Sequence, residues 1–280
     1  MNAPSYSYQC DDSVGNKSTV GVLLVGPWKN GEFAEILSPL SMSADWQRTA
    51  SCEEAAALLQ ETEFAPELIL LACPLPDTYL DADVEQLLLA APLARLVVVA
   101  GTWCEGELRT GTPLSGVLRL YWYEFPGWWT SAINTLGHGG CPPWSQPLDG
   151  PHSGRCLDTI QAELTGVVAI DCKLISTFDA LAGALGPYKA ECHWARRGQF
   201  EQLPSQVTAG IWDGGQLEPL ELERLRIFAQ EICKRGGRVI ALLDFPRQEH
   251  LAMVRDAGGS AVMGKPYVVE ELVSRLLSLQ

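Results

Sequence analysis

Apolar runs alternate with helix-patterned segments through the second half of the chain. Strands are expected at residues 166–170, 190–195, 209–213, 238–243 and 260–264. Helices are expected at 177–185, 199–203, 219–234, 246–257 and 268–279. Continuous apolar strands separated by helices indicate a parallel sheet that is covered on both faces.

The first half repeats this scheme more loosely. Strands are expected at 20–25, 68–72, 96–100 and 117–123, and helices at 31–40, 52–62 and 81–91. Ser51-Cys52-Glu53-Glu54 is a capping box that opens one of these helices. A Gly/Pro-rich stretch follows, and the chain beyond it has the size of a second domain. The expected division is a disordered segment 1–18, a domain 19–136, a linker 137–164 and a domain 165–280.

Composition and charge limit the classes of function. The 280 residues are 47% hydrophobic and 19% charged, so the chain can bury a full core. The net charge is −14, and residues 1–150 carry 6 Lys and Arg against 18 Asp and Glu, or −12. Without a basic stripe, direct binding of nucleic acid is not expected.

Hydropathy and cysteine usage suggest a compartment. No apolar run reaches the length of a membrane span, and the first residues are polar. The nine cysteines are mostly scattered singly through patterned segments, as reduced thiols usually are. We therefore expect a cytoplasmic protein without membrane contact.

Charged residues stand at the ends of three expected strands in the second half. Asp171 and Asp213 each close an apolar run, and Lys265-Pro266 closes another. The carboxyl ends of parallel strands meet at one edge of the sheet, where ligands and chemistry are usually found. Asp171, Asp213 and Lys265 are therefore expected to lie close together.

In the order and spacing of these elements, residues 165–280 resemble a response-regulator receiver domain. The resemblance implies a phosphoryl acceptor at Asp213, a Lys-Pro motif at Lys265-Pro266, and Asp171 as the first of two acidic residues that hold Mg²⁺. It departs from the family at the second acidic position, which is Cys172. The Thr/Ser position is assigned to Leu243, and the aromatic switch position to Val262.

The first half resembles the same family more distantly, over about residues 20–135. Ala72 stands at the acceptor position, Gly26-Pro27-Trp28 replaces the acidic pair, and Phe125-Pro126 replaces the Lys-Pro pair. The resemblance implies a pseudo-receiver domain. The expected fold class is therefore α/β, with two doubly wound, flavodoxin-like domains that each contain a five-stranded parallel sheet.

Phosphoryl transfer requires a carboxylate nucleophile, a divalent cation and a fixed positive charge. Asp213 and Lys265 supply the first and the third. Asp171 and Asp213 form at most a weak Mg²⁺ site, because a neutral thiol at Cys172 is a poor ligand for a hard cation. No cofactor is expected, and we interpret Asp213 with Lys265 as a mainly structural pair.

Aromatic and charged residues cluster in two segments after the fourth and fifth strands of the first half. Such a composition is typical of a binding hot spot, although the same rings also suit the core of a small domain with its charges paired internally. Both interpretations stay open, and a protein segment or the second domain is the favoured occupant. The candidate binding residues are Trp103, Glu105, Glu107, Arg109, Arg119, Trp122, Glu124, Trp128 and Trp129.

His138, Cys141, His152 and Cys156 have spacings compatible with zinc, but they lie in a Gly/Pro tract. A linker with incidental His and Cys is the favoured interpretation. Sequence signatures of common enzyme classes are absent.

The expected function is a non-catalytic signalling protein that acts by binding a protein partner. One alternative is a response regulator that is phosphorylated at Asp213 and uses the first domain as its output. A weaker alternative is an enzyme or ligand-binding protein that uses the aromatic segments. The apolar face of the helix 268–279 suits either a homodimer or pairing of the two domains within one chain.

Overall fold

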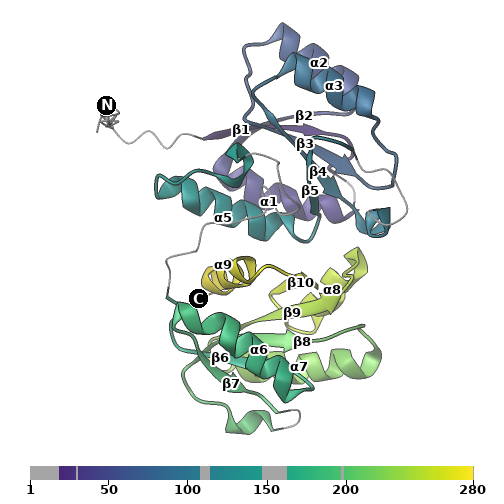
Figure 1. Ribbon diagram of the computed structural model, residues 1–280. Helices are drawn as coiled ribbons and strands as arrows, with labels where there is room; N and C mark the ends of the chain where they lie inside the picture. Colours follow the sequence, from purple (N-terminus) through teal and green to yellow (C-terminus); the bar gives the residue numbers. More distant parts are fainter. Residues whose placement is uncertain (1–18, 30, 108–113, 147–162, 197–198, 280) are drawn as a thin grey trace, which may run out of the picture.

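The computed structural model describes residues 19–29, 31–107, 114–146, 163–196 and 199–279. They form two domains, each built on a five-stranded parallel sheet with helices on both faces (Figure 1). The strand orders are β2-β1-β3-β4-β5 and β10-β9-β8-β6-β7, which are the same order when each domain is numbered separately. The predicted flavodoxin-like fold class is thereby confirmed for both halves. Residues 1–18, predicted to be disordered, lie outside the described part.

The first domain alternates strands and helices along the chain. Its elements are β1 (Val20–Val25), η1 (Gly31–Phe33), α1 (Ala34–Ser43), β2 (Ala44–Thr49), α2 (Cys52–Glu61), β3 (Leu68–Cys73), α3 (Asp81–Ala90), β4 (Arg95–Ala100), η2 (Thr102–Cys104), β5 (Leu118–Tyr121), α5 (Phe125–Gly137) and η3 (Pro143–Ser145). Ser51 caps α2 as predicted, because its side chain accepts a hydrogen bond from the Glu54 N–H at 3.2 Å.

The second domain follows the predicted order of elements. They are β6 (Val167–Asp171), α6 (Ile175–Leu185), η4 (Gly186–Tyr188), β7 (Glu191–Trp194), η5 (Phe200–Gln202), β8 (Val207–Asp213), α7 (Pro219–Cys233), β9 (Arg238–Asp244), α8 (Gln248–Asp256), β10 (Ala261–Lys265) and α9 (Val269–Leu279). In the described residues of the connection between β7 and β8 the helix is the short η5, where the first domain has the ten-residue helix α2.

Two elements of the first domain differ from the sequence prediction. Strand β2 was not expected, because Ala44–Thr49 reads ADWQRT and only its last residue is buried. The segment after Tyr121 was expected to continue a strand to residue 123, but β5 ends at Tyr121 and a 13-residue helix begins at Phe125. Pro126 occupies the first turn of this helix, where its missing N–H has no structural cost.

The aromatic residues of α5 are part of the core of the first domain. Trp128 and Trp129 are 3% and 1% exposed, and each packs against Trp144 with ring centroids 5.6 and 5.7 Å apart. Arg95 holds the segment around Trp144, because its guanidinium donates to the carbonyl oxygens of Trp144 and Gln146 at 2.8 and 2.7 Å. Residues 143–146, which were predicted to lie in the linker, therefore pack on the first domain.

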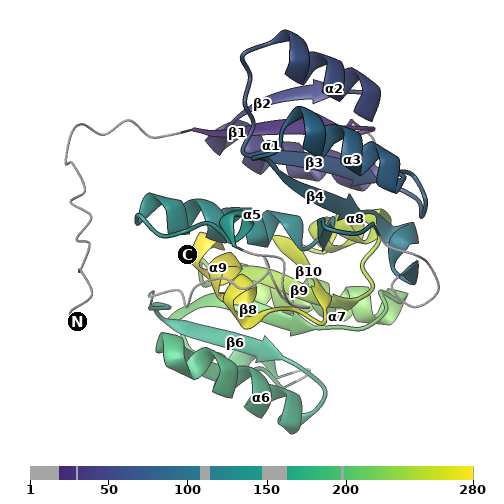
Figure 2. The ribbon, with the colours of Figure 1, turned by 45° about the horizontal axis from the view of Figure 1, so that its top comes forward.

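The two domains pack against each other through equivalent parts of their folds. Helix α5 lies against α9, and each is the helix that follows the fifth strand of its domain (Figures 1 and 2). Leu251 of α8 packs against the core cluster that contains Trp128 and Trp129. The approach is close at two glycines, because a Cβ atom on Gly264 would lie 2.3 Å from the Tyr123 ring, and one on Gly127 would lie 2.3 Å from Glu271. Within the described residues no helix has the length and apolar character needed to cross a membrane.

Candidate functional site

The carboxyl ends of β8, β9 and β10 bring together one lysine and two aspartates. The Lys265 ammonium nitrogen lies 3.1 Å from Asp213 Oδ1 and 3.0 Å from Asp244 Oδ1. It also donates to the carbonyl oxygen of Gly214. The predicted proximity of Asp213 and Lys265 is therefore present, and a second carboxylate shares the same ammonium group.

Asp244 is a residue that the sequence analysis missed. The Thr/Ser position had been assigned to Leu243, but the register pairs Lys265 with Asp244, and Leu243 is fully buried in the core. Asp244 therefore stands beside Lys265 and the candidate acceptor, whereas Leu243, to which the Thr/Ser position was assigned, has no hydroxyl and packs in the core. The signal was available, since Asp244 directly follows an apolar run, just as Asp213 does.

The turn after Asp213 requires a residue without a side chain. A Cβ atom on Gly214 would lie 1.9 Å from the ring of Trp212, which is fully buried under the turn. The Gly214 N–H donates to the Leu242 carbonyl oxygen at 3.0 Å, so the turn is fixed to β9. The backbone thus holds the Asp213 side chain next to Lys265. Val262, at the position assigned to the aromatic switch, is buried in the core.

The donor groups on the other side of Asp213 do not suit Mg²⁺. Asp171 is fully buried at the end of β6, and Cys172 is 2% exposed beside it. Burial raises the pKa of the Cys172 thiol to about 11, and the charges of Asp213 and Asp171 add to the shift. A neutral thiol is a poor Mg²⁺ ligand, and Asp213 is already bound to Lys265. In the described part of the chain no three His, Cys, Asp or Glu side chains are grouped to hold a metal ion.

The equivalent edge of the first domain is closed by a tyrosine. Ala72 is fully buried, and the Tyr79 hydroxyl lies 3.0 Å from its carbonyl oxygen and 3.1 Å from that of Val25. Burial raises the pKa of Tyr79 above its ordinary value, so the phenol stays protonated. The side chain joins the ends of β1 and β3 at the place where the resemblance implied acidic residues.

Replacing Tyr79 with phenylalanine is expected to lower the free energy of unfolding by about 1–2 kcal/mol. The variant keeps the ring but removes the hydroxyl that both carbonyl oxygens face. Urea unfolding of wild type and variant measures the difference. A variant as stable as wild type would show that these contacts contribute nothing to stability.

A glutamate and a threonine complete this edge of the first domain. Glu32 accepts hydrogen bonds from the Thr102 N–H at 2.9 Å and from its hydroxyl at 2.6 Å, and the Trp122 indole N–H lies 3.2 Å from that hydroxyl. Phe125-Pro126 had been assigned to the Lys-Pro position, but these residues open α5. The residue that follows β5 is Trp122, whose N–H donates to the Ala100 carbonyl oxygen at 2.9 Å. Nothing in the sequence pattern pointed to Glu32.

The structure places most of the candidate aromatic residues in the core. Trp122, Trp128 and Trp129 are buried, whereas Trp103 is 77% exposed. Their burial favours the second of the two interpretations that the sequence left open. The first domain also covers part of the second with Tyr123, whose ring contacts the strand β10 at Gly264.

The charged candidate residues are mostly paired inside the first domain. Arg119 donates to the Glu107 carboxylate, and both side chains are nearly buried. Glu124 accepts a hydrogen bond from the Tyr121 N–H at 2.8 Å. Burial raises the pKa of Glu105, while a hydrogen bond with Tyr123 and the charge of Arg247 in the second domain oppose the shift. Arg109 lies outside the described residues.

Only two of the four His and Cys residues with spacings compatible with zinc lie in the described part of the chain. His138 and Cys141 are exposed, and the His138 ring nitrogen lies 2.7 Å from the Asn134 carbonyl oxygen of its own helix. His152 and Cys156 lie outside the described residues.

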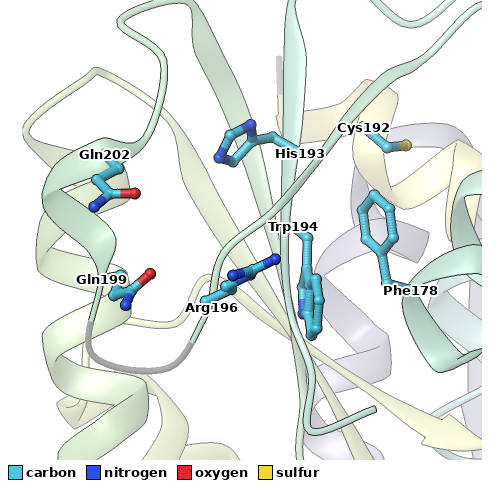
Figure 3. A pocket seen from close by; sticks show the side chains of 7 residues that line it. All are labelled: Phe178, Cys192, His193, Trp194, Arg196, Gln199 and Gln202. Atoms are coloured by element: carbon cyan, nitrogen blue, oxygen red, sulfur yellow. The ribbon is translucent and has the colours of Figure 1, made fainter. Parts of the chain in front are cut away.

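A cavity of about 360 Å³ lies beside the edge strand β7. Figure 3 shows it between this strand, helix α6 and the short helix η5. The Trp194 ring contacts Phe178 at 6.1 Å and the Arg196 guanidinium at 5.0 Å between centres. The cavity is next to the connection where the second domain has no counterpart of α2, and none of the predicted site residues lines it. Its lining residues are Phe178, Cys192, His193, Trp194, Arg196, Gln199 and Gln202.

The strand order and the positions of Asp213 and Lys265 define the class of fold. Both domains are receiver-like, and the chain contains them in tandem. No protein-family model matches the chain, and no curated protein matches it either.

Solved structures similar to this chain include a response regulator receiver domain protein from Methanospirillum hungatei. It is 17% identical, with a TM-score of 0.34, and the match covers 40% of this chain and 91% of that one. A response regulator from Thermotoga maritima is 22% identical, with a TM-score of 0.35 and coverages of 41% and 97%. A putative two-component system response regulator/GGDEF domain protein is 16% identical, with a TM-score of 0.36 and coverages of 92% and 98%.

Proposed function

We propose that this protein is a non-catalytic signalling protein whose two receiver-like domains act by binding a protein partner. The observation that carries the proposal is the pairing of Lys265 with both Asp213 and Asp244. A phosphoryl group on Asp213 would add negative charge next to the Asp244 carboxylate, and no hydroxyl stands at that position to bind it. The phosphoryl group and the Asp244 carboxylate would both be negatively charged and would repel each other.

The first domain supports the same proposal. Its acceptor position is Ala72, which has no nucleophile, and the Tyr79 hydroxyl occupies the edge of the sheet beside it. In our proposal neither domain requires Mg²⁺. The first domain has no acceptor carboxylate at Ala72, and in the second domain Cys172 replaces one of the two acidic residues. The cytoplasmic location stays a prediction.

Exposed apolar side chains favour a protein as the partner. Large apolar residues are exposed in the segment from the end of β3 through η2 of the first domain, and exposed apolar surface of this kind often marks protein contacts. The local acidity disfavours nucleic acid. These residues are Leu75, Leu80, Leu88, Leu89, Leu93 and Trp103.

Incubation with a small-molecule phosphodonor and Mg²⁺ tests the proposal. We expect the intact mass of the wild-type protein to show no added phosphoryl group. The double variant Cys172→Asp/Asp244→Thr places a second acidic residue next to Asp171 and replaces the carboxylate beside Lys265 with a hydroxyl, and we expect it to gain a phosphoryl group. The same variant with Asp213→Asn should not.

The wild-type measurement also decides between the proposal and its alternative. Stoichiometric phosphorylation of wild-type Asp213 would contradict the proposal and support a response regulator that uses its first domain as the output. Circular dichroism of each variant shows whether the fold is kept, so that a lack of modification is not confused with unfolding.

A further inference from the structure

Two buried cysteines lie side by side at the carboxyl edge of the first domain's sheet. The Sγ atoms of Cys73 and Cys104 are 3.8 Å apart, and the two side chains are 4% and 0% exposed. Cys73 is the last residue of β3 and Cys104 the last residue of η2. The Gly101 N–H donates to the Cys73 carbonyl oxygen at 2.8 Å, and the Cys104 N–H donates to the Gly101 carbonyl oxygen at 3.0 Å. The backbone therefore holds both thiols in place.

We propose that Cys73 and Cys104 are a redox-active thiol pair that a hydroperoxide oxidises to a disulfide. A disulfide bond is about 2 Å long, so the sulfur atoms have to approach by roughly another 2 Å. Rotation of the two side chains about their Cα–Cβ bonds can supply a movement of this size. The proposal assigns a modification site that is independent of the Asp213 site.

The environment of the pair distinguishes the two thiols. The two thiols are in hydrogen-bond contact, and the contact with Cys104 lowers the pKa of Cys73 against the effect of burial. Thr78 and the Arg119 charge act in the same direction. The same hydrogen bond raises the pKa of Cys104 above its ordinary value. Since the thiolate is the reactive form, Cys73 is the attacking sulfur and Cys104 the resolving one.

The reaction balances with one hydroperoxide as the oxidant. The Cys73 thiolate attacks an oxygen atom of hydrogen peroxide and the O–O bond breaks, which gives a sulfenic acid at Cys73. The hydroxide that leaves takes up the proton that Cys73 had released and becomes the first water. The Cys104 sulfur then loses its proton, attacks the Cys73 sulfur and displaces its hydroxyl group as a second water. Two thiols and one peroxide thus give one disulfide and two waters, and both electrons come from the thiols.

The other cysteines differ from this pair. Seven cysteines lie in the described part of the chain, and within it no other sulfur–sulfur contact is present. Burial raises the pKa of Cys52 to about 12 and that of Cys172 to about 11. Cys52 is in the same core cluster as Cys73 and Cys104, so it is a matched control for burial.

Oxidation of Cys73 and Cys104 would restrain the segment that follows Cys104, which interacts with the second domain. Glu105 follows Cys104 directly, forms a hydrogen bond with Tyr123 and lies within the field of Arg247. Tyr123 in turn contacts β10 at Gly264. The disulfide would tie this segment to the end of β3.

Non-reducing peptide mapping of the full-length protein after treatment with hydrogen peroxide tests the proposal. We expect the peptides of Cys73 and Cys104 to be joined, with the loss of two hydrogen atoms, and to separate again after reduction. The variant Cys52→Ser should form the same link. In Cys104→Ser, which has no resolving thiol, a sulfenic acid at Cys73 should react with a dimedone probe.

The wild-type map alone decides the proposal, even if a cysteine variant fails to fold. Recovery of both peptides in reduced form after peroxide treatment, or a disulfide from Cys73 to another cysteine, would overturn it. The rate of linking should also rise with pH below the ordinary pKa of a thiol, because the lowered pKa of Cys73 increases its thiolate fraction there.

Discussion

Replacing Arg119 with methionine is expected to lower the free energy of unfolding by about 3 kcal/mol. The Arg119 and Glu107 side chains are 11% and 6% exposed and form an ion pair inside the first domain. Without the guanidinium, the Glu107 carboxylate stays buried without its cationic partner, and this is more costly than the loss of the pair itself. Chemical denaturation followed by fluorescence measures the change.

Two control variants show whether burial of the charge is the cause. The double variant Arg119→Met/Glu107→Met should recover most of the lost stability, because apolar side chains replace both ions. Arg226→Met breaks a pair with Glu223 whose side chains are 46% and 53% exposed, and it should change stability by less than about 1 kcal/mol. Equal losses for Arg119→Met and Arg226→Met would contradict the explanation.

Replacing Gly264 with alanine is expected to cost about 1–3 kcal/mol and to weaken the contact between the domains. The added Cβ atom would lie 2.3 Å from the Tyr123 ring, which is rigid and 8% exposed. The domains therefore have to move apart or the ring has to move. Small-angle scattering should give a larger radius of gyration, and unfolding should become less cooperative.

A strand glycine in the first domain provides the matched control. At Gly21 of β1 the nearest atoms to an added Cβ atom are 3.4 Å away, so Gly21→Ala should leave the radius of gyration unchanged. The cost of Gly264→Ala should also disappear in a Tyr123→Ala background, because the clashing ring is absent. If Gly264→Ala lowered the stability of Tyr123→Ala as much as that of wild type, a clash with the Tyr123 ring would not be the cause.

The second domain was predictable because its strands are continuous apolar runs bounded by helices. β8 and β9 have seven residues each, and all but four of these fourteen are buried, so the pattern was clear. β2 gave no such pattern, since an edge strand with a half-exposed face is mostly polar. α5 was missed because Pro126, Gly127 and the tryptophans suggest a turn or a strand, whereas burial of the rings determines its structure.

For the candidate site, the sequence predicted which charged residues end strands, but not all the contacts that they make. Asp213 and Lys265 were expected to meet because both end strands of one parallel sheet. The contact of Asp244 with Lys265 depends on the register of β9 with β10, because a shift of one residue reverses the face on which a side chain lies. Tyr79 reaches the sheet edge of the first domain from a loop and Glu32 from the short helix η1, and periodicity does not reveal the path of such segments.

Contact between α5 and α9 occurs within one polypeptide, so its strength is independent of protein concentration. A tethered partner has an effective concentration that is commonly on the order of millimolar, and dilution does not change it. Two separate receiver-like proteins would respond to their own abundance, but this pair does not. Any signal that opens the arrangement must therefore change the free energy of the contact itself, for example at Tyr123 or Glu271.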